Sequence, residues 1–141
     1  MFGPFALVAA ALFAGAAIYV SVSEHPARLS LDDRSAVDEF NTSYPPAALM
    51  QASLALIGTV LGVLEWMMTG RVIWLMGALI LFANVPYTFI SIMPTNTALK
   101  ARGGEGANFE TREMLERWGR LHAVRSLLGA VAVVIFLWAS I

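Results

Sequence analysis

Four polar side chains recur along one charge-free stretch of the chain, residues 72–99. At spacings of four, three and four, they are Asn84, Thr88, Ser91 and Thr95. Such spacing places them on one face of a helix. Polar groups are costly in hydrocarbon unless they find a partner or line a cavity. Two interpretations stay open for this stripe: interhelical hydrogen bonding and a lined cavity.

Titratable groups that can act on a substrate lie near the ends of the other apolar segments. Glu24 and His25 follow the first apolar segment, and His122 and Arg125 open the last one. Imidazole titrates near neutral pH and can act as a base, and a guanidinium can hold an oxyanion. Alternatively, His25, His122 and Glu24 are candidate metal ligands. No H-x-x-x-H or E-x-x-H pair supports such a site.

The composition restricts the class of protein. Of 141 residues, 58% are hydrophobic and 13% are charged, whereas a soluble domain carries about 25% charged residues. A single-domain membrane protein is therefore predicted, in contact with lipid. The net charge is −1, so we expect no nucleic-acid partner, and the absence of cysteine excludes thiol catalysis and disulfides.

Four apolar segments are long enough to cross a bilayer. We place these spans at residues 4–24, 46–68, 72–96 and 118–140. A tight turn at residues 69–71 makes the second and third helices antiparallel neighbours, and the four spans alternate in direction. The prediction is an all-α, integral membrane four-helix bundle of up-down topology. A charged amphipathic extension, beginning at Phe109, leads into the fourth helix.

Prolines are expected to mark bends or ends of these helices. Pro26 indicates either a kink or the end of the first span, followed by a polar surface loop over residues 27–44. Pro45-Pro46 then opens the second helix, where proline is tolerated in the first turn. Pro86 kinks the third helix, and Pro94 closes it at the membrane surface.

A glycine pair marks the second span. Gly58 and Gly62 form a G-x-x-x-G motif on the same face as Gln51 and Glu65. This motif lets two helix backbones approach closely. It favours packing within the bundle, and a homo-oligomer is the alternative use of the same face.

Basic residues predict the orientation. The first and third loops, with the adjoining helix ends, lie on one side and hold eight Lys/Arg, whereas the other side has only Arg71. The positive-inside rule places these loops in the cytoplasm and both termini outside. We expect the bacterial cytoplasmic (inner) membrane.

This topology brings polar residues from all four helices to one depth at the cytoplasmic edge. They are Glu24 and His25, Tyr44 and Gln51, Thr88, Thr95 and Asn96, and Trp118, His122 and Arg125. Bundles build their sites from facing side chains, so a pocket is predicted there. Structural roles stay open for the same groups. Arg125 can pair with Glu24, His122 can bond a carbonyl, and Asn96 can cap a helix.

Three segments resemble a known family. They are Glu-His-Pro-Ala at residues 24–27, V-P-Y-T-F-I-S-I-M-P-T-N-T-A-L at residues 85–99, and W-x3-H-x2-R at Trp118, His122 and Arg125. These are similar to segments of the anthrone oxygenase-like family of small four-helix membrane proteins, and the resemblance covers nearly the whole chain. It implies that fold, and it implies oxidation of anthrones to anthraquinones by molecular oxygen without an established cofactor, as some members perform.

On this resemblance we expect oxidation of a small lipophilic aromatic molecule, anthrone-like or phenolic, in a cytoplasm-facing pocket. His122 or His25 is the expected base, and Arg125 with Asn96 is expected to hold the oxyanion. The other expected substrate contacts are Trp118, Tyr44 and Tyr87 by stacking, and Glu24, Gln51, Asn84, Thr88 and Thr95. Two alternatives remain: a non-catalytic lipophile binder, carrier or accessory subunit, and a His/Glu metal-dependent enzyme.

Overall fold

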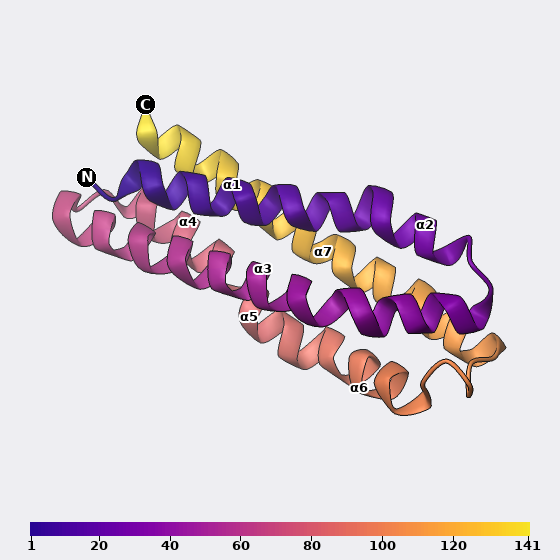
Figure 1. Ribbon diagram of the computed structural model, residues 1–141. Helices are drawn as coiled ribbons and strands as arrows, with labels where there is room; N and C mark the ends of the chain where they lie inside the picture. The colour runs from indigo at the N-terminus through magenta and orange to yellow at the C-terminus, as the bar shows by residue number, and fades with distance from the viewer.

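The computed structural model describes residues 1–141 as four long helical segments joined by three short turns (Figure 1). In chain order these segments are α1 (Gly3–Tyr19), a π-helical segment (Val20–Glu24) and α2 (His25–Leu29); α3 (Asp33–Thr69); α4 (Val72–Phe82), α5 (Asn84–Tyr87), a second π-helical segment (Thr88–Ile92) and α6 (Met93–Arg102); and α7 (Phe109–Ser140). There is no strand, which confirms the predicted all-α class.

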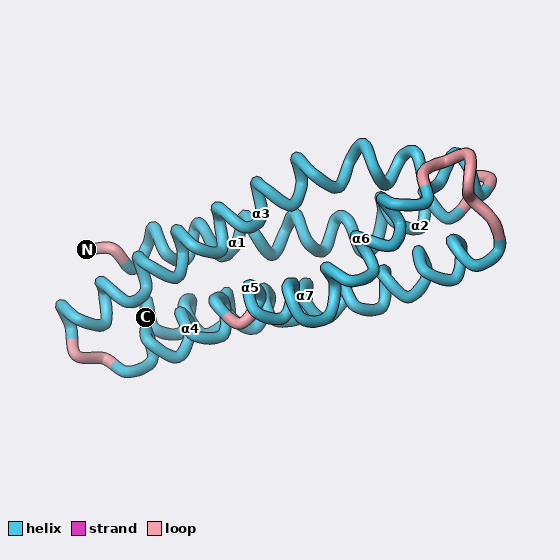
Figure 2. The backbone as a smooth tube through the Cα atoms, turned by 90° about the horizontal axis from the view of Figure 1, so that it is seen from below, coloured by secondary structure: helices cyan, strands magenta, loops and turns pink.

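The segments pack as an antiparallel bundle. Both α1 and α4 pack against α3 and α7, and the two termini lie at the same end (Figures 1 and 2). Each of the four segments is long and apolar enough to cross a membrane. The protein is therefore an integral membrane four-helix bundle, as predicted. The helices extend beyond the predicted spans, mostly at the end that carries the first and third turns.

The buried core has two parts along the bundle axis. One lies toward the termini and includes Phe13, Trp74 and Phe136. The other lies toward the first and third turns and includes Phe40 and Trp118. Polar residues are buried between these clusters, so each apolar cluster can hold one side of a site.

The glycine pair on α3 packs inside the bundle. A Cβ at Gly58 would lie 2.6 Å from a methyl carbon of Leu81, and one at Gly62 would lie 2.8 Å from the ring of Phe136. Both glycines are buried in α3. The structure thus uses this face for helix packing within one chain, and the face is not free for a second copy.

Gly77 in α4 gives a direct test of this packing. A Cβ at Gly77 would lie 2.5 Å from Cε1 of Phe136, a fully buried ring already in contact with Trp74. We expect Gly77→Ala to destabilise the protein by about 1–3 kcal/mol, because overpacking displaces the ring. Gly15→Ala is the matched control, since nothing lies within 4 Å of its Cβ position. Thermal unfolding in detergent should show a lower Tm for the first variant only.

The prediction of a surface loop over residues 27–44 is wrong. The turn is confined to residues 30–32, and α3 begins at Asp33 with Pro45 and Pro46 in its interior. Asp32 caps this helix: its carboxylate accepts a hydrogen bond from the backbone N–H of Ser35 at 3.0 Å and another from its hydroxyl. These bonds lower the pKa of Asp32 below its ordinary value.

Tertiary packing explains why the helix persists through two prolines. Each proline removes one internal hydrogen bond. Two aromatic residues just before the prolines, however, pack edge-on against Trp118. The ring centroids are 5.2 Å apart for Phe40 and 6.0 Å apart for Tyr44, which directly precedes Pro45. Burial of these aromatic rings offsets the lost bonds. Local sequence signals therefore misplaced the start of α3.

The third helical segment is interrupted near the predicted kink at Pro86, and the interruption lies before the proline. The helix breaks at Ala83, visible in Figure 2 as a short non-helical segment beside α5. Pro86 has no N–H for the carbonyl of Phe82, which accounts for a break one turn upstream. The prediction that Pro94 ends the third helix is wrong, because α6 continues to Arg102. At Pro26 the helix does not end, because the π-helical segment leads directly into α2.

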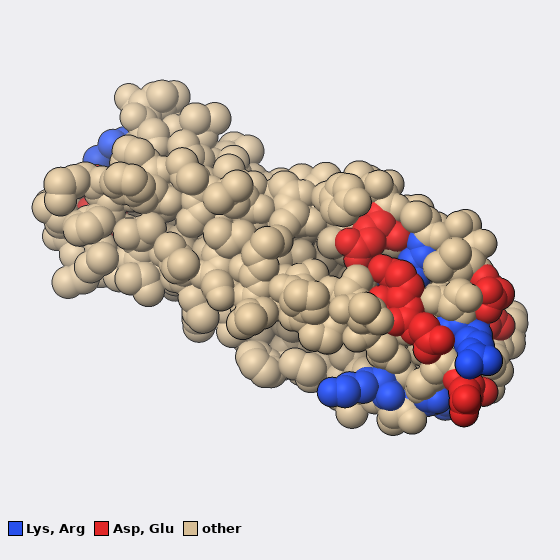
Figure 3. All heavy atoms as spheres, in the orientation of Figure 1, with Lys and Arg blue, Asp and Glu red and all other residues tan.

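Charged side chains gather at the end that holds the first and third turns (Figure 3). The opposite end holds Glu65, which accepts hydrogen bonds from the backbone N–H groups of Phe2 and Gly3, and Arg71, which donates to the carbonyl of Ala139 at 2.8 Å. This asymmetry is the one used to predict a cytoplasmic location for the charged end. That location remains a prediction.

Candidate functional site

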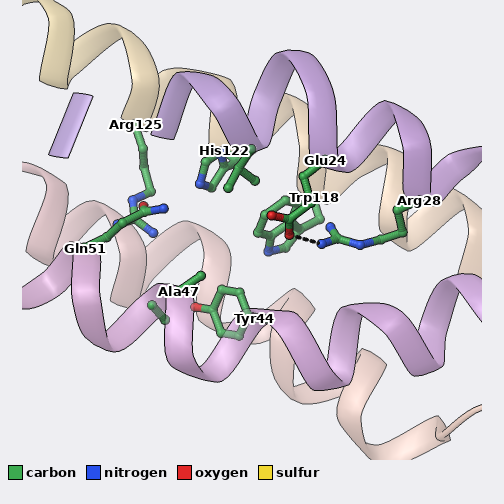
Figure 4. A pocket seen from close by; sticks show the side chains of 10 residues that line it. Glu24, Arg28, Tyr44, Ala47, Gln51, Trp118, His122 and Arg125 are labelled. Atoms are coloured by element: carbon green, nitrogen blue, oxygen red, sulfur yellow. Dashed lines mark hydrogen bonds and ion pairs between the residues drawn. The ribbon is translucent and has the colours of Figure 1, made fainter. Parts of the chain in front are cut away.

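A small cavity lies among the first π-helical segment, α2, α3 and α7, between the two core clusters. Its volume is about 10 Å³, roughly the space that one water molecule needs. The lining residues, several of them seen in Figure 4, are Val20, Glu24, Arg28, Tyr44, Ala47, Ala48, Gln51, Trp118, His122 and Arg125. Six predicted site residues therefore meet at one point: Glu24, Tyr44, Gln51, Trp118, His122 and Arg125.

Arg125 has an unusual environment for a cation. It is 4% exposed, it makes no hydrogen bond or ion pair, and its Nε atom is buried without a partner. Its guanidinium carbon lies 5.6 Å from the ring centroid of Phe13. An arginine in the membrane region normally pairs with an anion or a carbonyl. The predicted pairing with Glu24 does not form, so the guanidinium is free to bind something else.

Glu24 pairs with Arg28 instead. The NH2 group of Arg28 donates to Glu24 Oε1 at 2.7 Å and to Ser43 Oγ at 3.0 Å, and its NH1 group donates to Nδ1 of His25 at 3.0 Å. The Nε–H of Arg28 donates to Glu39. Arg28 is 2% exposed. A buried cation with two carboxylate partners is a structural centre, and it leaves Arg125 without one.

Asn96 is hydrogen-bonded to two aromatic side chains. Its Oδ1 accepts a hydrogen bond from Trp118 Nε1 at 2.8 Å, and its Nδ2 donates to the hydroxyl of Tyr44 at 2.6 Å. Asn96 does not line the small cavity. The structure therefore places Asn96 behind the two rings, where it fixes their orientation, and not beside Arg125 as the predicted oxyanion role requires.

His122 is held on two sides. Its ring stacks on Trp118, with centroids 4.7 Å apart and an interplanar angle of 19°. Its Nδ1 atom lies 3.1 Å from the hydroxyl of Ser21, which lies 2.9 Å from the hydroxyl of Ser126. His122 is 2% exposed and lines the small cavity. Its ring therefore has a fixed orientation in the site.

The other predicted base, His25, lies outside the small cavity. Its ring is 5.1 Å from that of Trp118, and it borders an outer groove with Ser21 and Gly119. Because Nδ1 accepts from Arg28, the proton resides on Nε2, which is buried without a partner. His25 therefore belongs to the Arg28 cluster.

A larger groove opens beside Arg125, between α3 and the bent third segment. Its volume is about 140 Å³, and it is lined by Tyr44, Ala48, Ala52, Ala55, Asn84, Val85, Thr88, Phe89, Met93 and Arg125. The groove shares Tyr44, Ala48 and Arg125 with the small cavity. The Oδ1 atom of Asn84, which lines the groove, is buried without a partner. The groove is thus mostly apolar, with Arg125 as its charged group.

The predicted polar stripe is divided between two hollows. Asn84 and Thr88 line the groove against α3, whereas Ser91 and Thr95 line a separate hollow against α7. The π-helical segment causes this division, because its wider turns change the direction of all residues that follow. Only the first two stripe residues therefore lie with the candidate site.

Tyr87 also has a structural contact. Its hydroxyl donates to the carbonyl of Leu121 at 3.0 Å, which ties α5 to α7. It lines neither the small cavity nor the groove. The predicted stacking of Tyr87 on a substrate is therefore not supported by its position.

The metal alternative finds no geometric support. No group of three or more His, Cys, Asp or Glu side chains is arranged so as to hold a metal ion. Of the proposed ligands, Glu24 and His122 share the small cavity, but His25 faces the Arg28 cluster and the outer groove. The three do not surround one point.

Sequence reasoning missed three residues of the site. Arg28 was assigned to a loop, although it follows Glu24 by four residues, the spacing of a helical ion pair. Ser126 follows His122 by four residues and shares its helical face. Ser21 gave no signal in the sequence, because its contact with His122 depends on how α1 and α7 pack.

Comparison with known proteins identifies the family. A sequence model described as anthrone oxygenase matches residues 40–135, a range that includes Tyr44, Gln51, Trp118, His122 and Arg125 but not Glu24 or Arg28. An anthrone oxygenase of Claviceps purpurea (strain 20.1) is 40% identical over 60 residues, which cover 37% of this chain and 34% of that protein. The match thus spans about a third of that relative's length. No solved structure matches. On the family match over most of its length, the chain belongs to the anthrone oxygenase family.

Proposed function

We propose that this protein is a membrane oxygenase that converts the acidic methylene of a flat, lipophilic, anthrone-like molecule to a carbonyl with molecular oxygen. Family membership supports the reaction class. The observation that carries the proposal is the buried and unpaired guanidinium of Arg125, which lines both the small cavity and the apolar groove.

An unpaired guanidinium suits this chemistry. Loss of a proton from the methylene of an anthrone places negative charge on the ring oxygen as an enolate. Arg125 is the cation available to hold that oxygen, because its donors have no partner within the chain. In a dry site a preorganised donor stabilises developing charge far more than in water. Substrate binding would supply the anionic partner that the protein leaves out.

The reaction balances without a metal or organic cofactor. A base removes one C–H proton, and the enolate passes one electron to O₂. The resulting carbon radical and superoxide combine to form a C–O bond. Loss of the second C–H proton and cleavage of the O–O bond then give the ketone and hydroxide, which takes up a proton. In sum, CH₂ and O₂ give C=O and H₂O; carbon is oxidised by four electrons and O₂ is reduced by four.

The groove gives the substrate a route from the bilayer. Its α3 wall is formed by alanines at positions 48, 52 and 55, which leave a flat surface, and its other wall includes Phe89, which is 63% exposed. A planar apolar molecule partitions into lipid and can approach Arg125 from the side. The groove must widen to admit a three-ring substrate.

Turnover of anthrone by the protein in lipid nanodiscs tests the proposal. We expect uptake of one O₂ per anthraquinone formed, and no product under anaerobic conditions. Ala52→Phe should lower kcat/KM by about tenfold or more, since a ring at this position fills the groove. Leu56→Phe is the matched control, because Leu56 lies one turn further along α3 and lines neither space. Wild-type protein without O₂ uptake would overturn the proposal.

The same experiment separates the non-catalytic alternative. The Tyr44–Asn96–Trp118 chain is fully paired and fits the view that some polar residues only hold helices together. Binding of anthrone that Ala52→Phe removes, without any O₂ uptake, would indicate a lipophile-binding protein instead of an oxygenase.

A further inference from the structure

We propose that the acid–base and oxyanion-binding roles are divided in this site: His122 donates a hydrogen bond from Nε2 to the substrate oxyanion, and Glu24 is the carboxylate that takes the substrate proton. Ser21 and Ser126 are positioning residues that determine which ring nitrogen of His122 carries the proton. This inference rests on the proposed function and assigns the groups that perform it.

The number of hydrogen-bond donors in this row determines the tautomer of His122. Three atoms lie in a row, Ser126 Oγ, Ser21 Oγ and His122 Nδ1, and the two serines have no other side-chain partner. If Ser126 donates to Ser21 and Ser21 donates to Nδ1, both hydroxyl protons are used. In the reverse direction the Ser126 proton has no acceptor, which is costly at a residue 8% exposed. The first arrangement leaves the imidazole proton on Nε2.

A neutral imidazole of this form presents a donor to the cavity. Nδ1 is occupied by Ser21 of the first π-helical segment, and stacking on Trp118 restricts the tilt of the ring. Figure 4 shows His122 between Arg125 and Trp118 in the cavity wall. The Nε2–H group and the free guanidinium are therefore two donors for one oxyanion, and His122 has no free lone pair with which to accept a carbon-bound proton.

Glu24 is the only carboxylate that lines the cavity. Arg28 holds its Oε1 atom at 2.7 Å, whereas Oε2 makes no hydrogen bond. The side chain is 24% exposed, so a proton received there has a path to water. The cavity volume of about 10 Å³ accommodates one water molecule. Such a water would be the link between the substrate and Glu24.

Variants of His122 distinguish a donor from a base. Glutamine carries an N–H group at about the reach of Nε2 but cannot take a proton, and asparagine reaches only about as far as Nδ1. We expect His122→Ala and His122→Asn to lower kcat about 100-fold or more, as loss of an oxyanion donor does. His122→Gln should keep kcat within about tenfold of wild type. Equal loss in all three variants would overturn the donor role.

The two carboxylates that pair with Arg28 supply a matched test of Glu24. Glu24 and Glu39 both contact the same guanidinium, but only Glu24 lines the cavity. Glu24→Gln should lower kcat about 100-fold or more, the size of a general-base contribution. Glu39→Gln should leave kcat within about threefold of the wild-type value. The two variants should lower the Tm by similar amounts. Equal kcat values for the two variants would overturn the role of Glu24.

Nitrogen NMR tests the inference without any turnover. In protein labelled with ¹⁵N-histidine, with His25→Gln used to assign the two rings, His122 should carry its proton on Nε2. Ser21→Ala should change the Nδ1 shift of His122, and Ser126→Ala should change it less. A proton on Nδ1 in the wild type would overturn the inference even if anthrone is oxidised. Failure of the wild type to oxidise anthrone would instead overturn the proposed function.

Discussion

Replacement of Arg125 by methionine is expected to lower the kcat/KM of anthrone oxidation by about 100-fold or more and to leave the bundle at least as stable as the wild type. Few substitutions separate function from stability so clearly. The guanidinium is 4% exposed and has no hydrogen-bond or ion-pair partner. Its burial therefore costs free energy that no hydrogen bond or ion pair recovers, and methionine is also a long, flexible side chain but carries no charge.

The expected size of each effect follows from the contacts. Loss of the cation that holds the enolate should lower kcat/KM by about 10²–10³-fold. Loss of the contact with Phe13 should cost about 0.5–2 kcal/mol, and relief of an unpaired buried charge should offset that cost. O₂ uptake with anthrone and thermal unfolding in the same detergent measure both quantities on one preparation.

A lysine variant refines this prediction. Arg125→Lys keeps the charge but loses the planar fork of donors. It should retain measurable turnover with a raised KM, because a point charge still attracts the enolate. If Arg125→Met oxidises anthrone at the wild-type rate, Arg125 has no part in the reaction. If it unfolds at a much lower temperature, Arg125 has a structural role and is not a free ligand-binding cation.

The sequence was sufficient to predict that Glu24, His122 and Arg125 meet in one cavity. Hydrocarbon offers no partner to Glu24, His122 or Arg125, so residues far apart in the chain had to turn toward one another once four spans alternated in direction. The G-x-x-x-G spacing likewise predicted that the glycines of α3 are buried, and they pack against α1, α4 and α7. These conclusions depend only on polarity, period and topology, which are properties of the sequence itself.

The sequence could not predict which arginine pairs with Glu24 or which neighbour the later stripe residues face. Two arginines compete for Glu24, and the outcome depends on whether the helix continues past Pro26 and brings Arg28 one turn beyond Glu24. The direction of Ser91 and Thr95 likewise depends on a π-helical turn that no residue pattern marks. In both places a proline follows the π-helical segment by two residues, Pro26 in the first case and Pro94 in the second.

Replacement of Arg28 by methionine is the counterpart of the Arg125 variant and should have the opposite effect on stability. Both guanidiniums are almost fully buried, but Arg28 bonds Glu24, Glu39, Ser43 and His25. Removing it leaves two carboxylates without their cation. Breaking such a buried pair costs about 3–5 kcal/mol.

The partners of Arg28 moderate that cost. The side chains of Glu24 and Glu39 are 24% and 34% exposed, so water can hydrate them in part. We therefore expect a loss of about 3 kcal/mol, at the lower end of that range. Arg28 also lies 5.6 Å from the ring of Trp118, so its loss should change the fluorescence of that residue before any unfolding.

The two methionine variants together test the assignment of roles. Arg28→Met should lower the Tm and shift tryptophan emission, whereas Arg125→Met should do neither, although both remove one buried positive charge from neighbouring positions in the bundle. Adding Glu39→Gln to Arg28→Met should restore part of the Tm, because one unpaired carboxylate is then neutral. If both arginine variants lose the same stability, the distinction between a paired structural cation and a free ligand-binding cation fails, and with it the reason for assigning the oxyanion to Arg125.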